Sequence, residues 1–109
     1  MSGLPYIECM KTLRSDSFKK WFQDLPNRTQ LQIEARLSRV EKDNHLGHHK
    51  HLKGHLWELK FNDGTRIYYT IKKVGEKTMF LILGGNKNGQ NKDINKAEKT
   101  ADQIHAEES

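Results

Sequence analysis

The strongest constraint on the fold is a β-hairpin predicted between residues 56 and 71. Apolar and polar side chains alternate in its two strands, Leu56–Phe61 and Arg66–Ile71. The intervening Asn62-Asp63-Gly64 is a strong turn signal. Because successive side chains of a strand point to opposite faces, one face should carry Trp57, Leu59, Phe61, Ile67, Tyr69 and Ile71. The opposite face should carry Glu58, Lys60, Arg66 and Tyr68.

A second cationic segment follows a third apolar run. The run Met79–Leu83 ends at Gly84-Gly85, and a polar stretch from Asn86 to Lys92 comes next. Phosphodiester cleavage needs fixed positive charge where a phosphorane-like state develops. An arginine, several lysines and a tyrosine held on a rigid sheet therefore favour phosphodiester chemistry.

A short strand and a first helix are predicted ahead of the hairpin. The strand covers Tyr6–Thr12, and the helix starts at Ser15 or Asp16. Its apolar stripe has the spacing i, i+3, i+4, i+7 and consists of Phe18, Trp21, Phe22 and Leu25. Pro26 should end this helix because proline lacks a backbone N–H.

A second helix should follow after the short connection at Pro26. Asn27 with Gln30 resembles a capping box at its start. The helix turns Ile33, Leu37 and Val40 inward, while Arg28, Arg36 and Arg39 lie largely outside that stripe. The two helices should form an antiparallel hairpin.

The rest of the chain completes one α+β domain. A histidine- and lysine-rich loop is predicted from Asn44 to His55, and a last helix starts at Asn91. The apolar stripe of this helix is Ile94, Ala97, Ala101 and Ile104. The predicted order is β-α-α-β-β-β-α over residues 1–109, with the helices packed on one sheet face. Residues 1–5 and 105–109 are expected to be frayed.

The charge balance narrows the class of partner. The formal charge is +5 and the isoelectric point is near 9.4, which favours a polyanion such as nucleic acid, or an acidic protein. The single cysteine, Cys9, cannot form an internal disulfide, which fits a reducing compartment. No apolar run approaches the ~20 residues of a membrane helix, and the first residues do not resemble a signal peptide. We expect a soluble cytoplasmic protein with no membrane partner.

Several short motifs, taken in order, resemble one family. They are Phe18-x-x-Trp21, Ala35-Arg36-Leu37, Leu52-x-Gly54, Leu56-Trp57-Glu58-Leu59, Gly64-x-Arg66-Ile67-Tyr68-Tyr69, Gly84-Gly85-Asn86-Lys87 and Gln90-x-x-Asp93-Ile94-x-x-Ala97. Together they are similar to the bacterial RelE/ParE toxin superfamily, above all to its HigB-like addiction-module killer proteins. The resemblance implies a small, twisted, antiparallel-rich sheet packed by an N-terminal helical hairpin, with a C-terminal helix.

The resemblance also implies a function and a set of partners. The function is that of the toxin in a type II toxin–antitoxin pair, which cuts messenger RNA on the ribosome in the bacterial cytoplasm. The partners are the ribosome with its mRNA, a cognate antitoxin of helix-turn-helix type, and operator DNA reached through the antitoxin complex. We expect an acidic antitoxin that covers the basic face or displaces the last helix.

Four residues are catalytic candidates: Arg66, Lys87, Tyr68 and Lys60. Arg66 ranks first because its guanidinium can hold two phosphate oxygens and stays charged, and because the family has an arginine at this strand position. The structural alternative is a surface ion pair with Glu58. Lys87 follows a flexible glycine turn, but it also fits a solvated loop lysine. Tyr68 is suited either to stacking on a base or to proton transfer.

Further candidates for phosphate binding flank this group. They are Lys50, His51, Lys53, Gln90 and Lys92. Gln90 alternatively serves only to cap the last helix.

The histidine-rich segment raises the question of a metal site. Its histidines are His45, His48, His49, His51 and His55. Metal ligands need a firm scaffold, whereas this segment is a predicted loop beside lysines that repel a cation. We therefore expect no metal and no cofactor. One of these histidines remains a candidate general base, since imidazole titrates near neutral pH.

The candidate residues suggest cleavage without a metal. The ribose 2′-OH would attack the adjacent phosphate while Arg66 and Lys87 stabilise the charge, and a lysine, a histidine or Tyr68 would manage the protons. The products would be a 2′,3′-cyclic phosphate and a 5′-hydroxyl, with the ribosome lowering the entropic barrier by positioning the message.

Two alternative functions stay open: a ParE-like poison of DNA gyrase that acts by binding, and a non-catalytic remnant that pairs only with antitoxin and operator. Retention of Lys60, Arg66 and Lys87 favours the ribonuclease.

Overall fold

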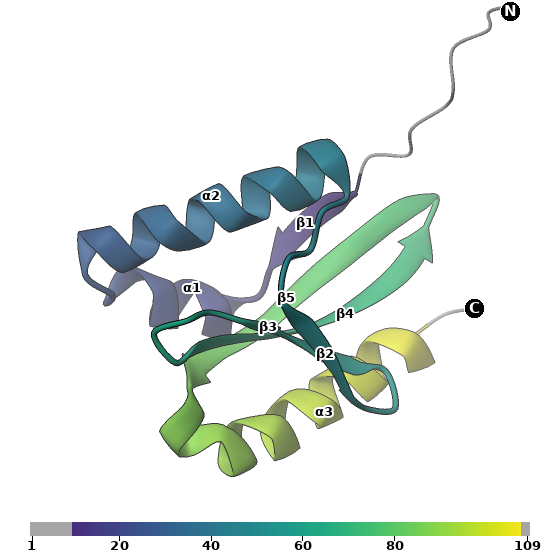
Figure 1. The fold of residues 1–109 in the computed structure, drawn as a ribbon. Coiled ribbons are helices and arrows are strands. Elements are labelled where there is room, and N and C mark those ends of the chain that lie inside the picture. The colour runs from purple at the N-terminus through teal and green to yellow at the C-terminus, as the bar shows by residue number, and fades with distance from the viewer. Residues whose placement is uncertain (1–9, 108–109) are drawn as a thin grey trace, which may run out of the picture.

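Helices cover both faces of a five-stranded sheet in the computed structural model, which describes residues 10–107 (Figure 1). The helices are α1 (Asp16–Gln23), α2 (Asn27–Asp43) and α3 (Gln90–Ala106), and a 3-10 turn, η1 (Lys87–Gly89), leads into α3. The strands are β1 (Lys11–Arg14), β2 (His49–Lys53), β3 (Leu56–Lys60), β4 (Thr65–Val74) and β5 (Glu76–Asn86). The predicted α+β class is confirmed.

The predicted hairpin is formed by β3 and β4. Within the described residues the sheet order is β1-β5-β4-β3-β2, in which β1 runs parallel to β5 and the other neighbours are antiparallel. Leu59 lies opposite Ile67 and Glu58 lies opposite Tyr68, so both faces carry the side chains expected. Gly64 adopts φ 95°, a backbone conformation that favours glycine in the connecting turn.

The histidine- and lysine-rich segment is not wholly the loop that the sequence predicted. Its residues His49–Lys53 form β2, an edge strand that pairs antiparallel with β3. An edge strand with both faces largely exposed needs no apolar alternation, and Leu52 is its one apolar residue. Within residues 10–107 the order of elements is therefore β-α-α-β-β-β-β-α, with one strand more than predicted.

The first described strand is shifted along the chain relative to the prediction. β1 begins at Lys11 and ends at Arg14, beyond the predicted end at Thr12, and the predicted stretch from Tyr6 to Cys9 lies outside the described residues. Ser15 ends the strand because its hydroxyl accepts a hydrogen bond from the Phe18 backbone N–H at 3.0 Å, which caps α1.

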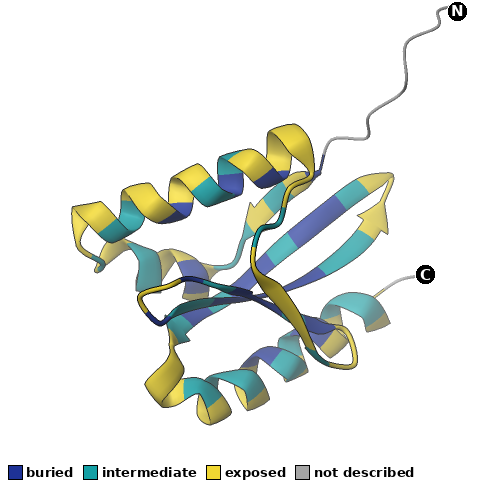
Figure 2. Cartoon of the chain, in the orientation of Figure 1, coloured by how far each residue is buried: buried dark blue, intermediate teal, exposed yellow. Residues whose placement is uncertain are grey.

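α1 and α2 pack on one face of the sheet over a core of large side chains, and the buried positions of α2 face that core (Figure 2). The core consists of Met10, Phe18, Ile33, Leu37, Val40, Leu59, Phe61, Ile67, Tyr69, Met79 and Leu81. The predicted inward stripes are thus confirmed. The predicted capping box is wrong, because Asn27 already occupies the first helical position. The Gln30 side chain instead donates to the Phe22 carbonyl oxygen at 2.8 Å and so joins the two helices.

α3 packs on the opposite face, so the prediction that all helices share one face is wrong. Its stripe is confirmed and closes a smaller core made of Leu56, Tyr68, Ile82, Ala97 and Ala101. His105, expected to be frayed, lies within α3. Its Nε2 is 2.9 Å from Thr70 Oγ1, and its ring stacks on His55 at a centroid distance of 3.7 Å. These contacts with β4 and with the turn before β3 hold the last turn of α3.

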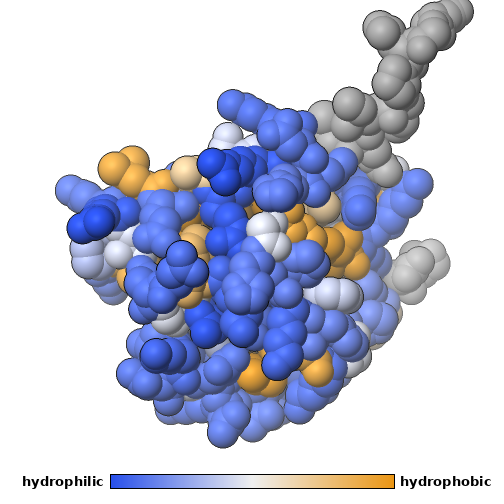
Figure 3. Space-filling model, in the orientation of Figure 1, coloured by the Kyte–Doolittle hydropathy of each residue, from blue (hydrophilic) through white to orange (hydrophobic). Residues whose placement is uncertain are grey.

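None of the helices within residues 10–107 combines the length and the apolar character needed to cross a bilayer. Hydrophilic side chains dominate the face seen in Figure 3.

Candidate active site

The α3 face of the sheet brings three predicted cationic residues to one corner. Lys60, at the end of β3, lies opposite Arg66 on β4, and Arg66 lies opposite Gly85 on β5. Just beyond β5, the backbone N–H of Lys87 donates to the Gly64 carbonyl oxygen at 2.9 Å. Lys60, Arg66 and Lys87 therefore stand at or just beyond the ends of three neighbouring strands.

Arg66 has a fixed and largely buried guanidinium, with 12% of its side chain exposed. Its Nη1 donates to the carbonyl oxygens of Phe61 at 3.2 Å and Thr65 at 3.0 Å. Its Nε lies 3.8 Å from Glu58 Oε1, too far for a hydrogen bond, and finds no hydrogen-bond partner among residues 10–107. The pairing with Glu58 that the sequence offered as an alternative is thus present, but it is loose. Such a guanidinium keeps donors for an anion.

Lys87 is exposed and is placed by the capped turn η1. The Asn86 side-chain oxygen accepts hydrogen bonds from the backbone N–H groups of Asn88 at 2.9 Å and Gly89 at 3.4 Å. The aliphatic part of Lys87 passes over Gly64, where an added Cβ would lie 3.6 Å from Lys87 Cδ. The ammonium group can therefore move while the base of the side chain stays near the β3–β4 turn.

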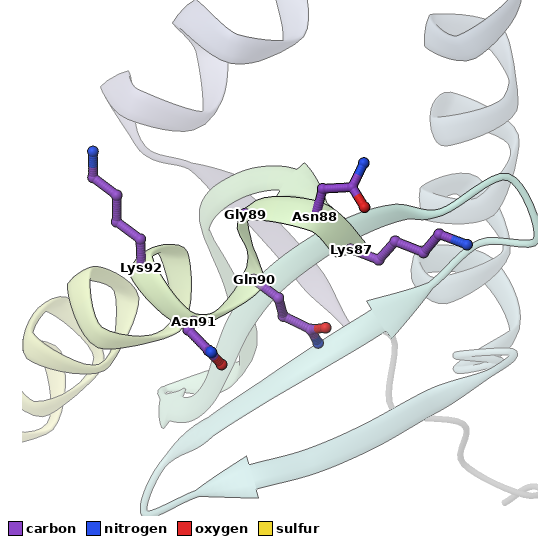
Figure 4. Close-up of a pocket in the computed structure, with 6 residues that line it drawn as sticks. All are labelled: Lys87, Asn88, Gly89, Gln90, Asn91 and Lys92. Carbon is purple, nitrogen blue, oxygen red and sulfur yellow. The ribbon is translucent and has the colours of Figure 1, made fainter.

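Gln90 connects α3 to this corner through Glu58. Its side chain points toward the sheet (Figure 4), and its Nε2 donates to Glu58 Oε1 at 2.9 Å. Glu58 is 1% exposed, so the bond satisfies a buried carboxylate that would otherwise be costly. The Gln90 amide is therefore engaged with the protein in this arrangement, although the sequence made it a candidate for phosphate binding.

Tyr68 is completely buried beneath α3, and its hydroxyl has no hydrogen-bond partner in the described part of the chain. Stacking on an RNA base, one of its two predicted roles, is not available here because α3 covers this face. Burial, together with the carboxylates of Asp93 and Glu58, raises the pKa of Tyr68 to about 12. The phenol is therefore protonated at neutral pH and is unsuited to act as a base.

Asp93 joins the site although the sequence gave it no role. Its Oδ2 lies against the backbone of Gly85, since a Cβ built there would be 2.3 Å from that oxygen. Partial burial raises the pKa of Asp93, and Lys92 and Lys96 oppose the shift. A carboxylate of raised pKa beside a cationic corner is a candidate general base. The signal in the sequence was the spacing of Gln90 and Asp93, which puts both on one side of the helix.

Lys60 also borders a hollow on the α2 side of the β3–β4 turn. This hollow has a volume of about 250 Å³, and its basic lining residues are Arg36, Arg39, His45, His48 and Lys60. Arg36 supports its wall, because Nε donates to the Leu46 carbonyl oxygen at 2.8 Å and Nη2 to that of His48 at 2.7 Å. Lys60 thus lies between the corner at Arg66 and this basic hollow.

Three candidates lie on β2, and the alternation of the strand puts the first two on opposite faces. Lys50 lies opposite Glu58 and therefore on the α3 face, whereas His51 lies opposite Trp57 on the other face. The His51 ring contacts the Trp57 ring at a centroid distance of 4.7 Å. Within residues 10–107, no three histidine, cysteine, aspartate or glutamate side chains gather closely enough to hold a metal ion.

The last two candidates, Lys53 at the end of β2 and Lys92 on α3, lie away from the corner. Lys53 forms an ion pair with Glu98 at 3.0 Å. Lys92 lines an open hollow of about 490 Å³ with Lys87, but the two side chains point in opposite directions (Figure 4). The structure therefore brings Arg66, Lys87, Lys60, Tyr68 and Gln90 together with Glu58 and Asp93, and leaves Lys53, Lys92 and His51 apart.

Comparisons with known sequences identify a family. The family described as "Phage derived protein Gp49-like" matches residues 20–104. A protein of Haemophilus influenzae described as uncharacterized is 30% identical over 99 residues, which span 90% of this chain and 96% of that protein.

Solved structures show where this fold occurs. A mutant of the Escherichia coli toxin RelE in the free state matches with a TM-score of 0.61 and 17% identity, over 76% of this chain and 88% of that one. The YoeB/ParE toxin from Agrobacterium tumefaciens gives 0.58 and 18%, over 71% and 98%. The toxin–antitoxin complex RelBE2 from Mycobacterium tuberculosis gives 0.59 and 13%, over 72% and 98%. The chain therefore belongs to the Phage derived protein Gp49-like family, and its fold is that of the RelE/ParE toxin superfamily.

Proposed function

We propose that this protein is the toxin of a type II toxin–antitoxin pair and that it cuts ribosome-bound messenger RNA without a metal ion. The observation that carries the proposal is the corner formed by Lys60, Arg66 and Lys87, where fixed and mobile positive charges meet. The likeness of the fold to RelE and to the YoeB/ParE toxin supports the toxin class.

Arg66 is the main charge-stabilising group in this proposal. Two carbonyl oxygens fix its Nη1, and we assign the donors of its Nη2 to the phosphate. A preorganised donor of this kind stabilises charge that develops on a phosphate oxygen without reorganisation during the reaction. Lys87 adds a charge on a flexible side chain, which can follow the phosphate as its geometry changes.

Proton transfer is assigned to groups near the corner, and the raised pKa of Asp93 favours its carboxylate as the base. The 2′-OH attacks the adjacent phosphorus, Asp93 accepts the 2′-OH proton, and a lysine of the corner donates a proton to the leaving 5′-oxygen. The bond from phosphorus to the 5′-oxygen breaks as the bond to the 2′-oxygen forms, which gives a 2′,3′-cyclic phosphate and a 5′-hydroxyl. Tyr68, with its pKa raised to about 12, stays protonated throughout.

The partner follows from the same proposal. The RelBE2 structure is a complex of a toxin with an antitoxin. We extend that kind of partner to this chain and assign it acidic residues, because the formal charge here is +5. The antitoxin would cover the corner at Arg66 or contact α3.

The test compares two exposed lysines in a cleavage assay with purified protein, programmed ribosomes and end-labelled mRNA. Lys87→Ala loses no core packing, and we expect cleavage to fall about 100-fold, the size of effect seen when one charge-stabilising donor is removed. Lys19→Ala, on α1 at the opposite face, is the matched control and should cleave like the wild type. Equal cleavage by Lys87→Ala and the wild type would reject the assigned site. A block in DNA replication without mRNA cleavage would favour the gyrase alternative.

A further inference from the structure

One carboxylate oxygen is shared between α3 and the candidate catalytic arginine. Glu58 Oε1 accepts the hydrogen bond from Gln90 Nε2 at 2.9 Å, and the same atom lies 3.8 Å from Arg66 Nε. Glu58 is 1% exposed, and Arg66 Nε is buried without a hydrogen-bond partner in the described chain. Gln90 therefore occupies the oxygen that Arg66 Nε would otherwise bind.

Loss of the Gln90 amide would leave a buried carboxylate without its hydrogen bond. A buried carboxylate is costly when unsatisfied, so Glu58 should turn to Arg66 Nε, a buried donor 3.8 Å away that has no hydrogen-bond partner within residues 10–107. The contact would shorten to a charge-assisted hydrogen bond of about 2.8 Å. The positive charge of Arg66 would then be compensated within the protein, and less of it would act on a bound phosphate.

We propose that Gln90 is a positioning residue for Arg66 and acts through Glu58, by holding the carboxylate away from the guanidinium. The inference rests on the proposed function, in which Arg66 stabilises charge on the cleaved phosphate. The first turn of α3 thus does more than pack on the sheet, because its contact with Glu58 keeps Arg66 available to an anion.

The first experiment is a double-mutant cycle in the ribosome-dependent cleavage assay, using full-length protein. Gln90→Ala should lower the rate constant of cleavage about tenfold at saturating ribosomes, an effect smaller than removal of a charge-stabilising donor itself. Glu58→Gln removes the charge that competes for Arg66. The double variant should therefore cleave within about threefold of Glu58→Gln alone, because the two effects are coupled through one contact.

The second experiment follows Arg66 directly and needs no catalytic activity. The ¹H–¹⁵N signal of Arg66 Nε is assigned by its absence from the spectrum of Arg66→Lys. Gln90→Ala should move this signal downfield, because Nε–H gains a charged acceptor, and the double variant with Glu58→Gln should restore its position. Thr70→Val is the control, since it removes the hydroxyl that contacts His105 at the far end of α3. It should loosen that end and leave both the signal and the cleavage rate unchanged.

The outcomes separate this inference from the proposed function. If Glu58→Gln fails to rescue Gln90→Ala, or if Thr70→Val lowers cleavage as much as Gln90→Ala, Gln90 only anchors the helix and the inference is wrong. An Arg66 signal that does not move in Gln90→Ala would also overturn it. If the wild type cleaves no RNA while the signal moves and is restored as expected, the link between Gln90 and Arg66 stands and the ribonuclease proposal fails.

Discussion

Gly84 and Gly85 are neighbours in β5, yet each meets a different half of the molecule. A Cβ added to Gly84 would lie 2.1 Å from the Trp21 ring of α1, whereas one added to Gly85 would lie 2.3 Å from the Asp93 carboxylate of α3. The alternation of a strand explains the divergence. On the Gly84 side the sheet meets the large apolar core, and on the Gly85 side it meets the charged corner at Arg66.

The difference shows how the two faces divide stability and chemistry. The α1/α2 face buries large side chains such as Phe18, Ile33 and Leu37. The α3 face closes mainly with Ala97 and Ala101 and leaves room for buried polar groups. Small side chains bury less apolar area and therefore stabilise the fold less. We infer that the α1/α2 face supplies most of the stability of the domain, while the α3 face carries the residues of the proposed site.

The largest effect should come from a cavity on the α1/α2 face. Leu37→Ala should lower the free energy of unfolding by about 2–5 kcal/mol, because a buried leucine is replaced by a cavity. Ala101→Gly on α3 should cost only about 1 kcal/mol, since glycine weakens a helix without a large cavity. Urea unfolding measures both. Equal losses would contradict the inference that the α1/α2 face contributes more to stability than the α3 face.

Substitutions of the two glycines should show the difference between the two faces more finely. Gly84→Ala should cost about 1–3 kcal/mol, since the Trp21 ring is wedged between α1 and the sheet and the core must shift. Gly85→Ala should cost less, because the Asp93 carboxylate is the free end of a side chain and can swing away. It should instead reduce cleavage, because Asp93 is the proposed base. A larger stability loss for Gly85→Ala than for Gly84→Ala, measured by thermal unfolding, would contradict this division.

The smallest effect concerns pH. Burial raises the pKa of Asp93 above its ordinary value of 3.8, so ionised Asp93 destabilises the fold at neutral pH even though a carboxylate suits the first turn of a helix. The stabilising contribution of its protonated form is complete below the ordinary pKa and is lost as pH rises through the raised one. Asp93→Asn should therefore be slightly more stable than the wild type at pH 7, and the gain should shrink on acidification. Urea midpoints at several pH values test this, and a gain that grows toward acid pH would show the opposite sign.

Local patterns in the sequence were sufficient for much of the fold. The hairpin around Gly64, the stripe that includes Phe18 and the stripe that includes Ala97 were all predictable, because each depends on the period of one element. β2 was missed since an exposed edge strand lacks that period. The position of α3 was missed because the polar face of the hairpin looked exposed, although Glu58 and Tyr68 are buried there.

The candidate site was predictable in its charges but not in its contacts. Arg66 and Lys87 were found from residue type and from the family resemblance, and their proximity follows from strand register. The bond between Gln90 and Glu58 joins residues far apart in the sequence, and it exists only because α3 folds back over β3. Asp93 was missed for the same reason. No pattern within one element shows which side chains a second element will cover.

The polar edge strand β2 also bears on how copies of this protein meet. A free strand edge offers unpaired backbone groups to another sheet, which is a route to aggregation. β2 is short, is irregular between His51 and Lys53, and carries charge at Lys50 and Lys53. Each of these features disfavours the addition of a strand from a second molecule. The segment whose histidines first suggested a metal site thus protects one edge of the sheet. The protein can therefore reach a high concentration without joining to other copies through β2.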